Sequence, residues 1–201
     1  MQRTPTHIGI IPDGNRRWAT ENGFKKSDGY EFGLFSGIRL LRAAKKHNIK
    51  EITFYGFTVD NCKRPKPQVA AFSKACCDAV KMIENENVSL FIVGNTQSKC
   101  FPRELLPYTE KQPENKTRLK VNFLVNYGWE WDMKNNWASG AIPRIDLVIR
   151  WGGMRRLSGF LPLQTVYSDF YIVDDLWPNF KEEHFDAALK WYACQDITLG
   201  G

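Results

Sequence analysis

Apolar residues are grouped along the chain in two ways, as short runs and as longer segments with helical spacing. The short runs predict six β-strands, over residues 8–11, 51–57, 88–93, 119–125, 145–149 and 170–173. Apolar residues spaced three or four apart predict helices that begin at Tyr30 and Pro67, a helix over 160–167, and a last helix with Phe185 and Tyr192 on one face. A polar surface connector is predicted over 109–117.

Strands that alternate with helices are typical of a parallel sheet. We therefore expect an α/β fold, with one mainly parallel β-sheet and helices on both faces. The length of 201 residues fits a single domain. Ligands of such sheets bind beyond the carboxyl ends of the strands. Three polar loops, residues 13–17, 58–65 and 150–156, follow predicted strands directly. We expect these loops to meet in one cleft at the carboxyl edge of the sheet.

The composition favours anionic partners. Lys and Arg number 28 against 22 Asp and Glu, giving a net charge of +6, which is below the density expected of a nucleic-acid-binding tail. Five cysteines form no C-x-x-C pair and have no histidines at zinc-like spacing, as expected of a reduced, cytoplasmic protein. No apolar run approaches the length of a membrane span, so we expect at most peripheral membrane contact.

The first loop, DGNRRW, combines groups that bind phosphate. Gly14 permits close backbone approach, and two guanidiniums can each bind oxygens bidentately. Asp13 would weaken a pure anion site, so one interpretation makes it a Mg²⁺ ligand that bridges to a diphosphate. The other interpretation is a surface turn in which Asp13 pairs with its arginines. The local sequence favours neither, and the expected convergence of three loops favours the metal ligand.

Other reactive side chains fit structural roles better. Cys76 falls on the apolar face of the helix that begins at Pro67, so it is expected in the core. His7 precedes the first strand and is expected to be structural and not catalytic. The second glycine- and arginine-rich loop, RWGGMRRLS, is a further phosphate-binding candidate. The sequence offers no Ser/His/Asp or Cys/His constellation for nucleophilic catalysis.

Several motifs resemble, in order, those of the cis-prenyltransferases, which make undecaprenyl or dehydrodolichyl diphosphate. They are DGNRRW, DNxxRP, NYG, DLVIRxGGxxRLSxFLxxQ and YSDFYIVDDLWPNF. The resemblance covers nearly the whole chain and implies the same parallel α/β fold. It also implies the joining of an allylic prenyl diphosphate to isopentenyl diphosphate, with Mg²⁺ and release of pyrophosphate, in a homodimer.

The resemblance implies a role for each matching residue. The donor diphosphate and its Mg²⁺ would be held by Asp13, Gly14, Asn15, Arg16, Arg17, Trp18, Lys26 and Tyr30. The acceptor diphosphate would be bound by Arg150, Arg156 and Ser158, and Asp169 would be a further Mg²⁺ ligand. Asn61 would orient the acceptor and help remove its proton, supported by Thr58, Asp60 and Arg64.

The chain also departs from the family pattern. The segment between Gly128 and Ile145 is shorter by about a helix, Tyr30 stands in place of a usual His, and Cys62 in place of a usual Trp. We expect donor ionisation to be retained and elongation to be limited, or the acceptor to be different. Alternative acceptors are a second allylic diphosphate and a non-isoprenoid hydroxyl. A silent accessory subunit is a further alternative, whereas the position of the basic clusters at strand ends disfavours nucleic-acid binding.

Overall fold

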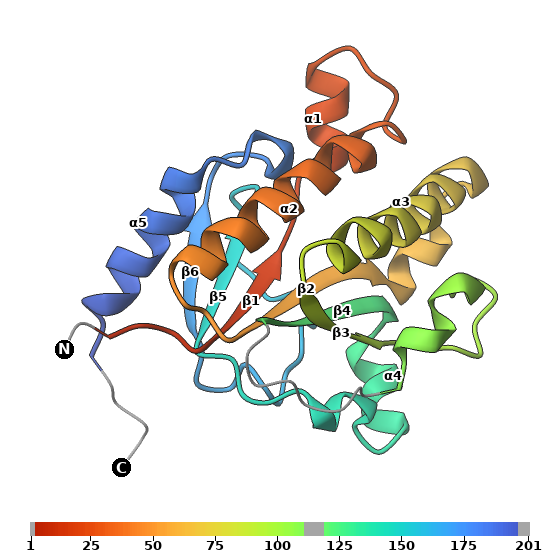
Figure 1. Cartoon of the computed structure of the whole chain (residues 1–201). Helices are drawn as coiled ribbons and strands as arrows, with labels where there is room; N and C mark the ends of the chain where they lie inside the picture. Colours follow the sequence, from red (N-terminus) through yellow and green to blue (C-terminus); the bar gives the residue numbers. More distant parts are fainter. Residues whose placement is uncertain (1–2, 111–118, 197–201) are drawn as a thin grey trace.

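The computed structural model describes residues 3–110 and 119–196, which form one six-stranded sheet with helices on both faces (Figure 1). The strands are β1 (His7–Ile11), β2 (Glu51–Thr58), β3 (Val88–Val93), β4 (Leu119–Tyr127), β5 (Leu147–Trp151) and β6 (Asp169–Val173). Their order is β3-β4-β2-β1-β5-β6, and each neighbouring pair is parallel. The predicted fold class is thereby confirmed. Most of the predicted connector 109–117 lies outside the described residues.

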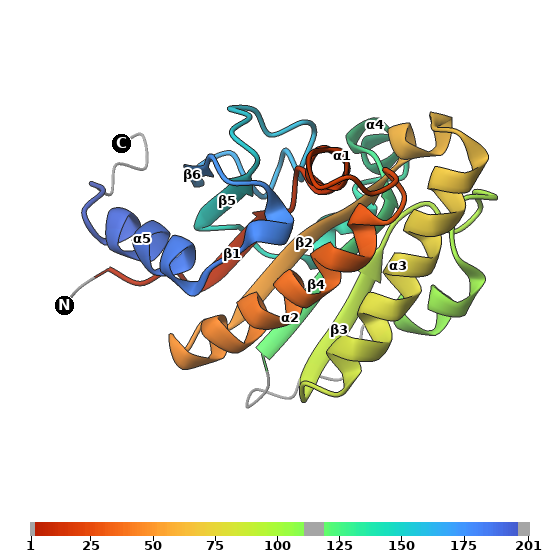
Figure 2. The ribbon, with the colours of Figure 1, turned by 90° about the horizontal axis from the view of Figure 1, so that it is seen from above.

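The three long helices cover one face of the sheet (Figure 2). They are α2 (Gly29–Lys46), α3 (Lys66–Glu84) and α5 (Glu182–Ala193), and their apolar sides pack on strand residues such as Ile8, Ile52 and Ile149 in the larger core. Cys76 is fully buried in this core, as its helical spacing predicts, and burial raises the pKa of its thiol. Each of these helices therefore forms because it can bury an amphipathic side against the sheet.

The opposite face is covered by shorter elements. α4 (Trp129–Lys134), η3 (Ala138–Ala141) and the turns between β5 and β6 pack on a second core that includes Tyr55, Tyr127 and Phe160. The helix predicted over 160–167 is wrong, because this segment consists of turns. Leu161 has a φ of 38°, which a helix does not allow, and Pro162 follows it. The remaining 3₁₀ segments are η1 (Val59–Lys63), η2 (Arg103–Tyr108) and η4 (Trp177–Asn179).

A short helix that the apolar pattern does not predict, α1 (Asn15–Glu21), begins directly after Gly14. Gly14 has a φ of 112°, and a Cβ there would lie 2.8 Å from the Leu176 side chain. The Trp177 N–H also donates to the Asp13 carbonyl at 3.0 Å. A glycine is therefore required at this turn, which holds Asp13 against the segment that follows β6.

His7 is structural, as expected. Its Nε2 lies 2.8 Å from Thr53 Oγ1 and its Nδ1 lies 3.0 Å from the Arg144 carbonyl, both within the sheet region. A neutral ring fits these partners when Nδ1 donates and Nε2 accepts. Burial lowers the pKa of His7, because the charged form would lose its hydration.

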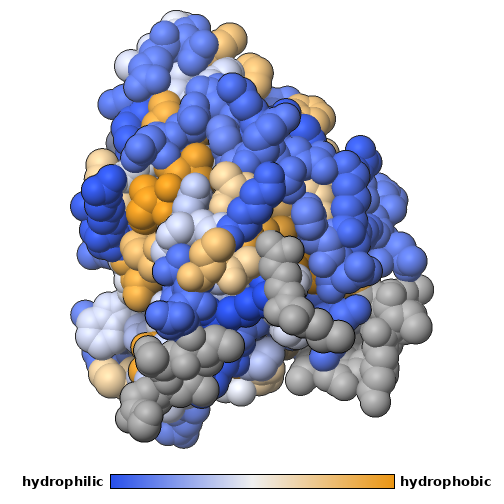
Figure 3. All heavy atoms as spheres, turned by 90° about the vertical axis from the view of Figure 1, so that its left-hand side faces the viewer, coloured by the Kyte–Doolittle hydropathy of each residue, from blue (hydrophilic) through white to orange (hydrophobic). Residues whose placement is uncertain are grey.

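The outer surface carries mostly hydrophilic side chains with smaller apolar areas between them on the face that includes α5 (Figure 3). None of the helices within residues 3–110 and 119–196 is long and apolar enough to cross a membrane.

Candidate active site

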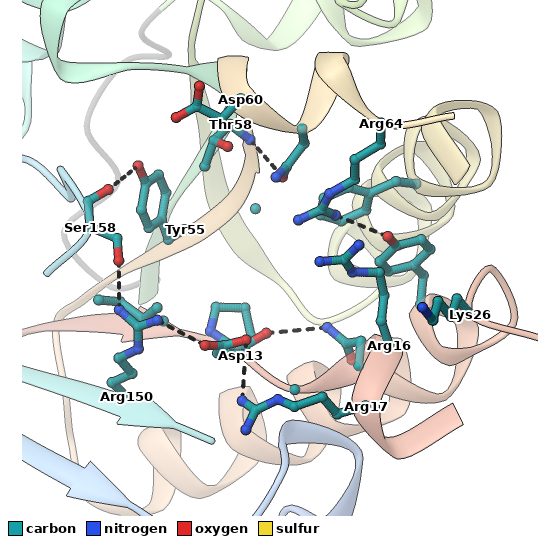
Figure 4. Close-up of a pocket in the computed structure, with 18 of the residues that line it drawn as sticks. Asp13, Arg16, Arg17, Lys26, Tyr55, Thr58, Asp60, Arg64, Arg150 and Ser158 are labelled. Atoms are coloured by element: carbon teal, nitrogen blue, oxygen red, sulfur yellow. Dashed lines mark hydrogen bonds and ion pairs between the residues drawn. The ribbon is translucent and has the colours of Figure 1, made fainter. Parts of the chain in front are cut away.

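A polar pocket of about 680 Å³ lies at the carboxyl ends of β1, β2 and β5 (Figure 4). The three loops predicted to converge meet there, and the strand order explains why: β1 lies between β2 and β5 in the sheet. Thirteen of the predicted site residues line it, namely Asp13, Gly14, Asn15, Arg16, Arg17, Lys26, Tyr30, Thr58, Asp60, Asn61, Arg64, Arg150 and Ser158.

Asp13 and Arg150 form the ion pair at the base of the pocket. Ile11 is paired with Arg150 in the sheet, so the register of β1 and β5 brings these two side chains together. Arg150 Nη2 donates to Asp13 Oδ2 at 2.8 Å, and its Nη1 donates to Ser158 Oγ at 2.9 Å and to the Arg156 carbonyl. The Arg150 side chain is 5% exposed and the Asp13 side chain is 33% exposed. The carboxylate therefore faces the pocket, while the guanidinium is buried and is held by Ser158 and the Arg156 carbonyl.

Further cations line the same side of the pocket. Arg17 Nη2 donates to the Gly152 carbonyl at 3.0 Å and lies 3.6 Å from Asp13 Oδ1. Arg16 and Lys26 also line the pocket, from α1 and from the connector before α2. Two of these cations, Arg17 and Arg150, lie against Asp13, and the others add positive charge along the pocket wall, which suits a multiply charged anion.

The loop after β2 forms the opposite wall. The Thr58 N–H donates to Asn61 Oδ1 at 3.1 Å, and the Thr58 side chain accepts in return from the Asn61 backbone, a reciprocal cap of η1. This cap orients the Asn61 side chain at the pocket wall. Asp60 lies at the rim with 74% of its side chain exposed and pairs with Lys63 at 2.6 Å.

A smaller apolar cavity of about 90 Å³ adjoins the polar pocket, between α2, α3 and the sheet. Tyr30 and Phe72 line both cavities and stack on each other, with ring centroids 4.5 Å apart and planes at 11°. Arg64 Nη1 donates to the Tyr30 hydroxyl at 3.0 Å. The Tyr30–Phe72 stack is therefore the wall between a charged compartment and an apolar one.

Two predicted substrate-binding residues are not at the pocket. The Trp18 Nε1–H donates to Asn179 Oδ1 at 2.7 Å, and its ring packs on Phe32 at 4.5 Å, because α1 turns this side chain away from the pocket. Arg156 has an exposed side chain and contributes only its carbonyl, which accepts from Arg150. Its assignment to the acceptor diphosphate stays a prediction.

Asp169 does not lie near Asp13. It is the first residue of β6 and pairs with Leu147 at the start of β5, so it is at the amino edge of the sheet, opposite the pocket. Its carboxylate forms an ion pair with Arg3 at 3.0 Å. The structure therefore contradicts a shared metal site of Asp13 and Asp169 within one chain.

The donor set decides how a metal could be held. Within residues 3–110 and 119–196 there is no group of three or more His, Cys, Asp or Glu side chains that could hold a metal ion. Mg²⁺ usually keeps few protein ligands and is bound by one or two carboxylates together with substrate phosphates. The carboxylate of Asp13, which lies beside Arg17 and Arg150 at the base of the pocket, fits this mode.

Tyr55 and Phe72 are pocket residues that the motif comparison missed. The Tyr55 hydroxyl donates to the Ser158 carbonyl at 3.0 Å, and burial raises the pKa of this phenol. Both residues read as core in an apolar pattern. The available signal was the position of Tyr55 near the carboxyl end of a predicted strand, where polar atoms face a ligand site.

Comparison with known proteins assigns the family. The prenyltransferase family model, which describes undecaprenyl diphosphate synthases, matches residues 11–139 and 133–200. A ditrans,polycis-undecaprenyl-diphosphate synthase from Yersinia pseudotuberculosis, specific for (2E,6E)-farnesyl diphosphate, is 33% identical over 99% of this chain and 91% of its own length. The chain belongs to the undecaprenyl diphosphate synthase family. It is a prenyltransferase by this membership, as the motifs imply.

Two further proteins are similar to this chain. The synthase of the same name from Escherichia coli K12 is 31% identical to this chain, over 97% of it and 89% of the relative. The crystal structure of lavandulyl diphosphate synthase from Lavandula x intermedia, in complex with dimethylallyl diphosphate, superposes with a TM-score of 0.82. It covers 98% of this chain and 99% of the plant protein at 22% identity, which shows that the two share the fold.

Proposed function

We propose that this prenyltransferase uses Mg²⁺ to transfer an allylic prenyl group to isopentenyl diphosphate and makes a short-chain product. The observation that carries the proposal is the adjacency of the two cavities across the Tyr30–Phe72 wall. A prenyl diphosphate has one charged and one apolar half, which match the two compartments. The names of the similar proteins, with farnesyl and dimethylallyl diphosphates, support donors of this class.

The donor diphosphate would lie among the cations around Asp13. Arg16, Arg17 and Lys26, which line the pocket, would donate to its oxygens, and Asp13 would hold the metal. When bound there, Mg²⁺ would offset negative charge that develops on the departing diphosphate. As the allylic C–O bond breaks, fixed cationic donors stabilise the leaving group more than the intact donor, which lowers the barrier.

The acceptor would lie between β5 and the loop after β2. Arg150 and Ser158 would bind its diphosphate, and Asn61 would orient it from the opposite wall. The new C–C bond forms at the donor's allylic carbon, and the proton leaves the carbon next to the resulting cation-like centre. A phosphate oxygen can receive this proton without a strong base, and Asn61, which the Thr58 cap holds in place, would help by orienting the acceptor.

The small apolar compartment supports a short product. Its volume of about 90 Å³ is small beside the polar pocket of about 680 Å³. A tail of many isoprenoid units cannot enter it without displacement of Phe72 or of neighbouring side chains. Elongation would therefore stop early.

Product analysis tests the proposal. Purified chain is incubated with Mg²⁺, isopentenyl diphosphate and dimethylallyl, geranyl or farnesyl diphosphate, and the products are identified by mass spectrometry. We expect one or a few short prenyl diphosphates, and a ladder of long products would refute the limit on elongation. Products formed without isopentenyl diphosphate would show a different acceptor. Lack of turnover with every donor would indicate an accessory subunit instead.

The homodimer and the cytoplasmic location implied by the resemblance stay predictions. Analytical ultracentrifugation of the purified chain tests the first, and fractionation of cells that express it tests the second.

A further inference from the structure

We propose that Tyr55 is a positioning residue, whose hydroxyl holds the Ser158 turn so that Arg150 presents its guanidinium to an anion in the pocket. The inference rests on the proposed function in one respect, namely that the anion is a diphosphate. Tyr55 lies outside the matching motifs. Its hydroxyl donates to a protein carbonyl, that of Ser158, and not to a substrate.

The geometry begins at the Tyr55 hydroxyl. This group donates to the Ser158 carbonyl at 3.0 Å, while the Ser158 Oγ accepts from Arg150 Nη1 at 2.9 Å (Figure 4). Arg150 in turn donates to Asp13 at 2.8 Å. One continuous chain of polar contacts therefore runs from β2 through the Ser158 turn to the ion pair at the base of the pocket.

Ser158 has a conformation that needs such support. Its φ of 53° is in the left-handed region, which serine seldom adopts, and the following Gly159 has a φ of 77°. A non-glycine residue in this region is strained and persists when the surrounding contacts hold it there. Tyr55 donates to the Ser158 carbonyl and Arg150 donates to the Ser158 hydroxyl, so these two contacts hold Ser158 in this conformation.

The Tyr55 ring is fixed on both sides. Its centroid lies 5.2 Å from that of Phe160 and 6.2 Å from that of Tyr127, and the residue is 8% exposed. The Tyr127 hydroxyl donates to the buried Asp132 carboxylate at 2.8 Å, which also accepts from the Ser139 N–H at 2.8 Å. The short segment that contains α4 and η3 thus supports the aromatic ring that supports the Ser158 turn.

The turn also contacts α4 directly. A Cβ on Gly159 would lie 2.6 Å from the Trp129 ring, so α4 lies closely against the residue after Ser158. α4 belongs to the segment between Gly128 and Ile145, which the motif comparison predicts to be shorter than the family pattern by about a helix. This segment contacts Tyr127 and Gly159. It therefore helps to place Arg150, the cation proposed to bind the acceptor diphosphate.

Removal of one hydroxyl tests the inference. We expect Tyr55→Phe to weaken binding of inorganic pyrophosphate about tenfold in calorimetric titrations, because the Ser158 turn loses a buried partner. The matched control is Tyr108→Phe, which removes a surface hydroxyl that donates to Glu84 and should leave pyrophosphate binding within about twofold of the wild type. In turnover, the KM for the acceptor should rise by a similar factor with little change in kcat.

A double-variant cycle separates positioning from a general loss of stability. If Tyr55 acts through Ser158, its substitution should add less than about twofold to the loss caused by Ser158→Gly alone. Full multiplication of the two losses, or unchanged pyrophosphate binding in a Tyr55→Phe protein with a lowered Tm, would overturn the inference. Failure of the wild type to bind pyrophosphate would instead count against the proposed function and the inference together.

Discussion

The substitution Asp13→Asn separates two roles of the carboxylate that its contacts allow. Asp13 lies 2.8 Å from Arg150 and 3.6 Å from Arg17, so it neutralises part of the positive charge around the pocket. The same carboxylate is 33% exposed toward the pocket and is the proposed metal ligand. Asparagine keeps the shape of the side chain and removes its charge.

The sign of the effect on diphosphate binding should depend on the metal. Without Mg²⁺, the Asp13 carboxylate repels a diphosphate oxygen at about 5 Å by about 1 to 3 kcal/mol for effective dielectric constants of about 80 to 20. Asp13→Asn should therefore bind pyrophosphate about 5- to 150-fold more tightly than the wild type in the presence of a chelator. With Mg²⁺ the order should reverse, because the variant lacks the carboxylate that holds the ion.

Calorimetric titration with pyrophosphate measures its affinity for the wild type and the variant, once with a chelator and once with Mg²⁺. Asp78→Asn is the matched control, since this carboxylate pairs with Lys74 on α3 and is outside the pocket. If Mg²⁺ strengthens binding equally in Asp13→Asn and in the wild type, Asp13 is not the metal ligand. If the variant binds more weakly even without metal, the main role of Asp13 is to organise the arginines, and the electrostatic reasoning is wrong.

Three further predictions address other parts of the site and the core. Asn61→Ala should lower kcat about 100-fold, because an oriented group at the acceptor is lost. It should also lower the free energy of unfolding by about 1 kcal/mol, because the η1 cap is lost. A kcat near that of the wild type would contradict the role of Asn61 at the acceptor. Phe72→Ala should lengthen the products seen by mass spectrometry, at a stability cost of about 1 to 3 kcal/mol, and unchanged product length would refute the apolar wall. The folded-state pKa of His7 is below its unfolded value, so its neutral form contributes stability above pH of about 6.5 that is lost as the pH falls through the folded pKa. Denaturant titrations should show a smaller loss between pH 7.5 and 5 in His7→Gln, and an equal loss would exclude His7 as its source.

The sequence predicted the site well where chemistry follows from strand direction. Alternating strands and helices indicate a parallel sheet, and that alone places the loops after β1, β2 and β5 at one edge. The pairing order of the strands is a tertiary property, so the contact between Asp13 and Arg150 could not be predicted from local pattern. The same rule about strand direction also predicts the error at Asp169, because a residue that begins a parallel strand lies at the other edge.

The errors at Trp18 and over 160–167 have a different physical origin. Trp18 is adjacent to Arg17 in sequence, but consecutive residues on a helix point about 100° apart, so motif membership does not place both in the pocket. The apolar residues of 160–167 do bury side chains in the second core, with Phe160 and Leu161 fully buried. Their backbone is determined by Leu161 at positive φ and by Pro162, which a hydrophobicity pattern does not register.

The central place of β1 in the sheet has a consequence for how the protein is made. β1 precedes the other five strands of this sheet along the chain, yet it pairs with β5 as well as β2, and residues 13 and 150 are 137 positions apart. Pairing over such separations is slow, because the intervening chain must be ordered first. A partly synthesised chain that ends before β5 would lack Arg150 and therefore one side of the pocket. Diphosphate binding would therefore report the completion of folding, and a ligand present during refolding would stabilise only molecules whose sheet is fully assembled.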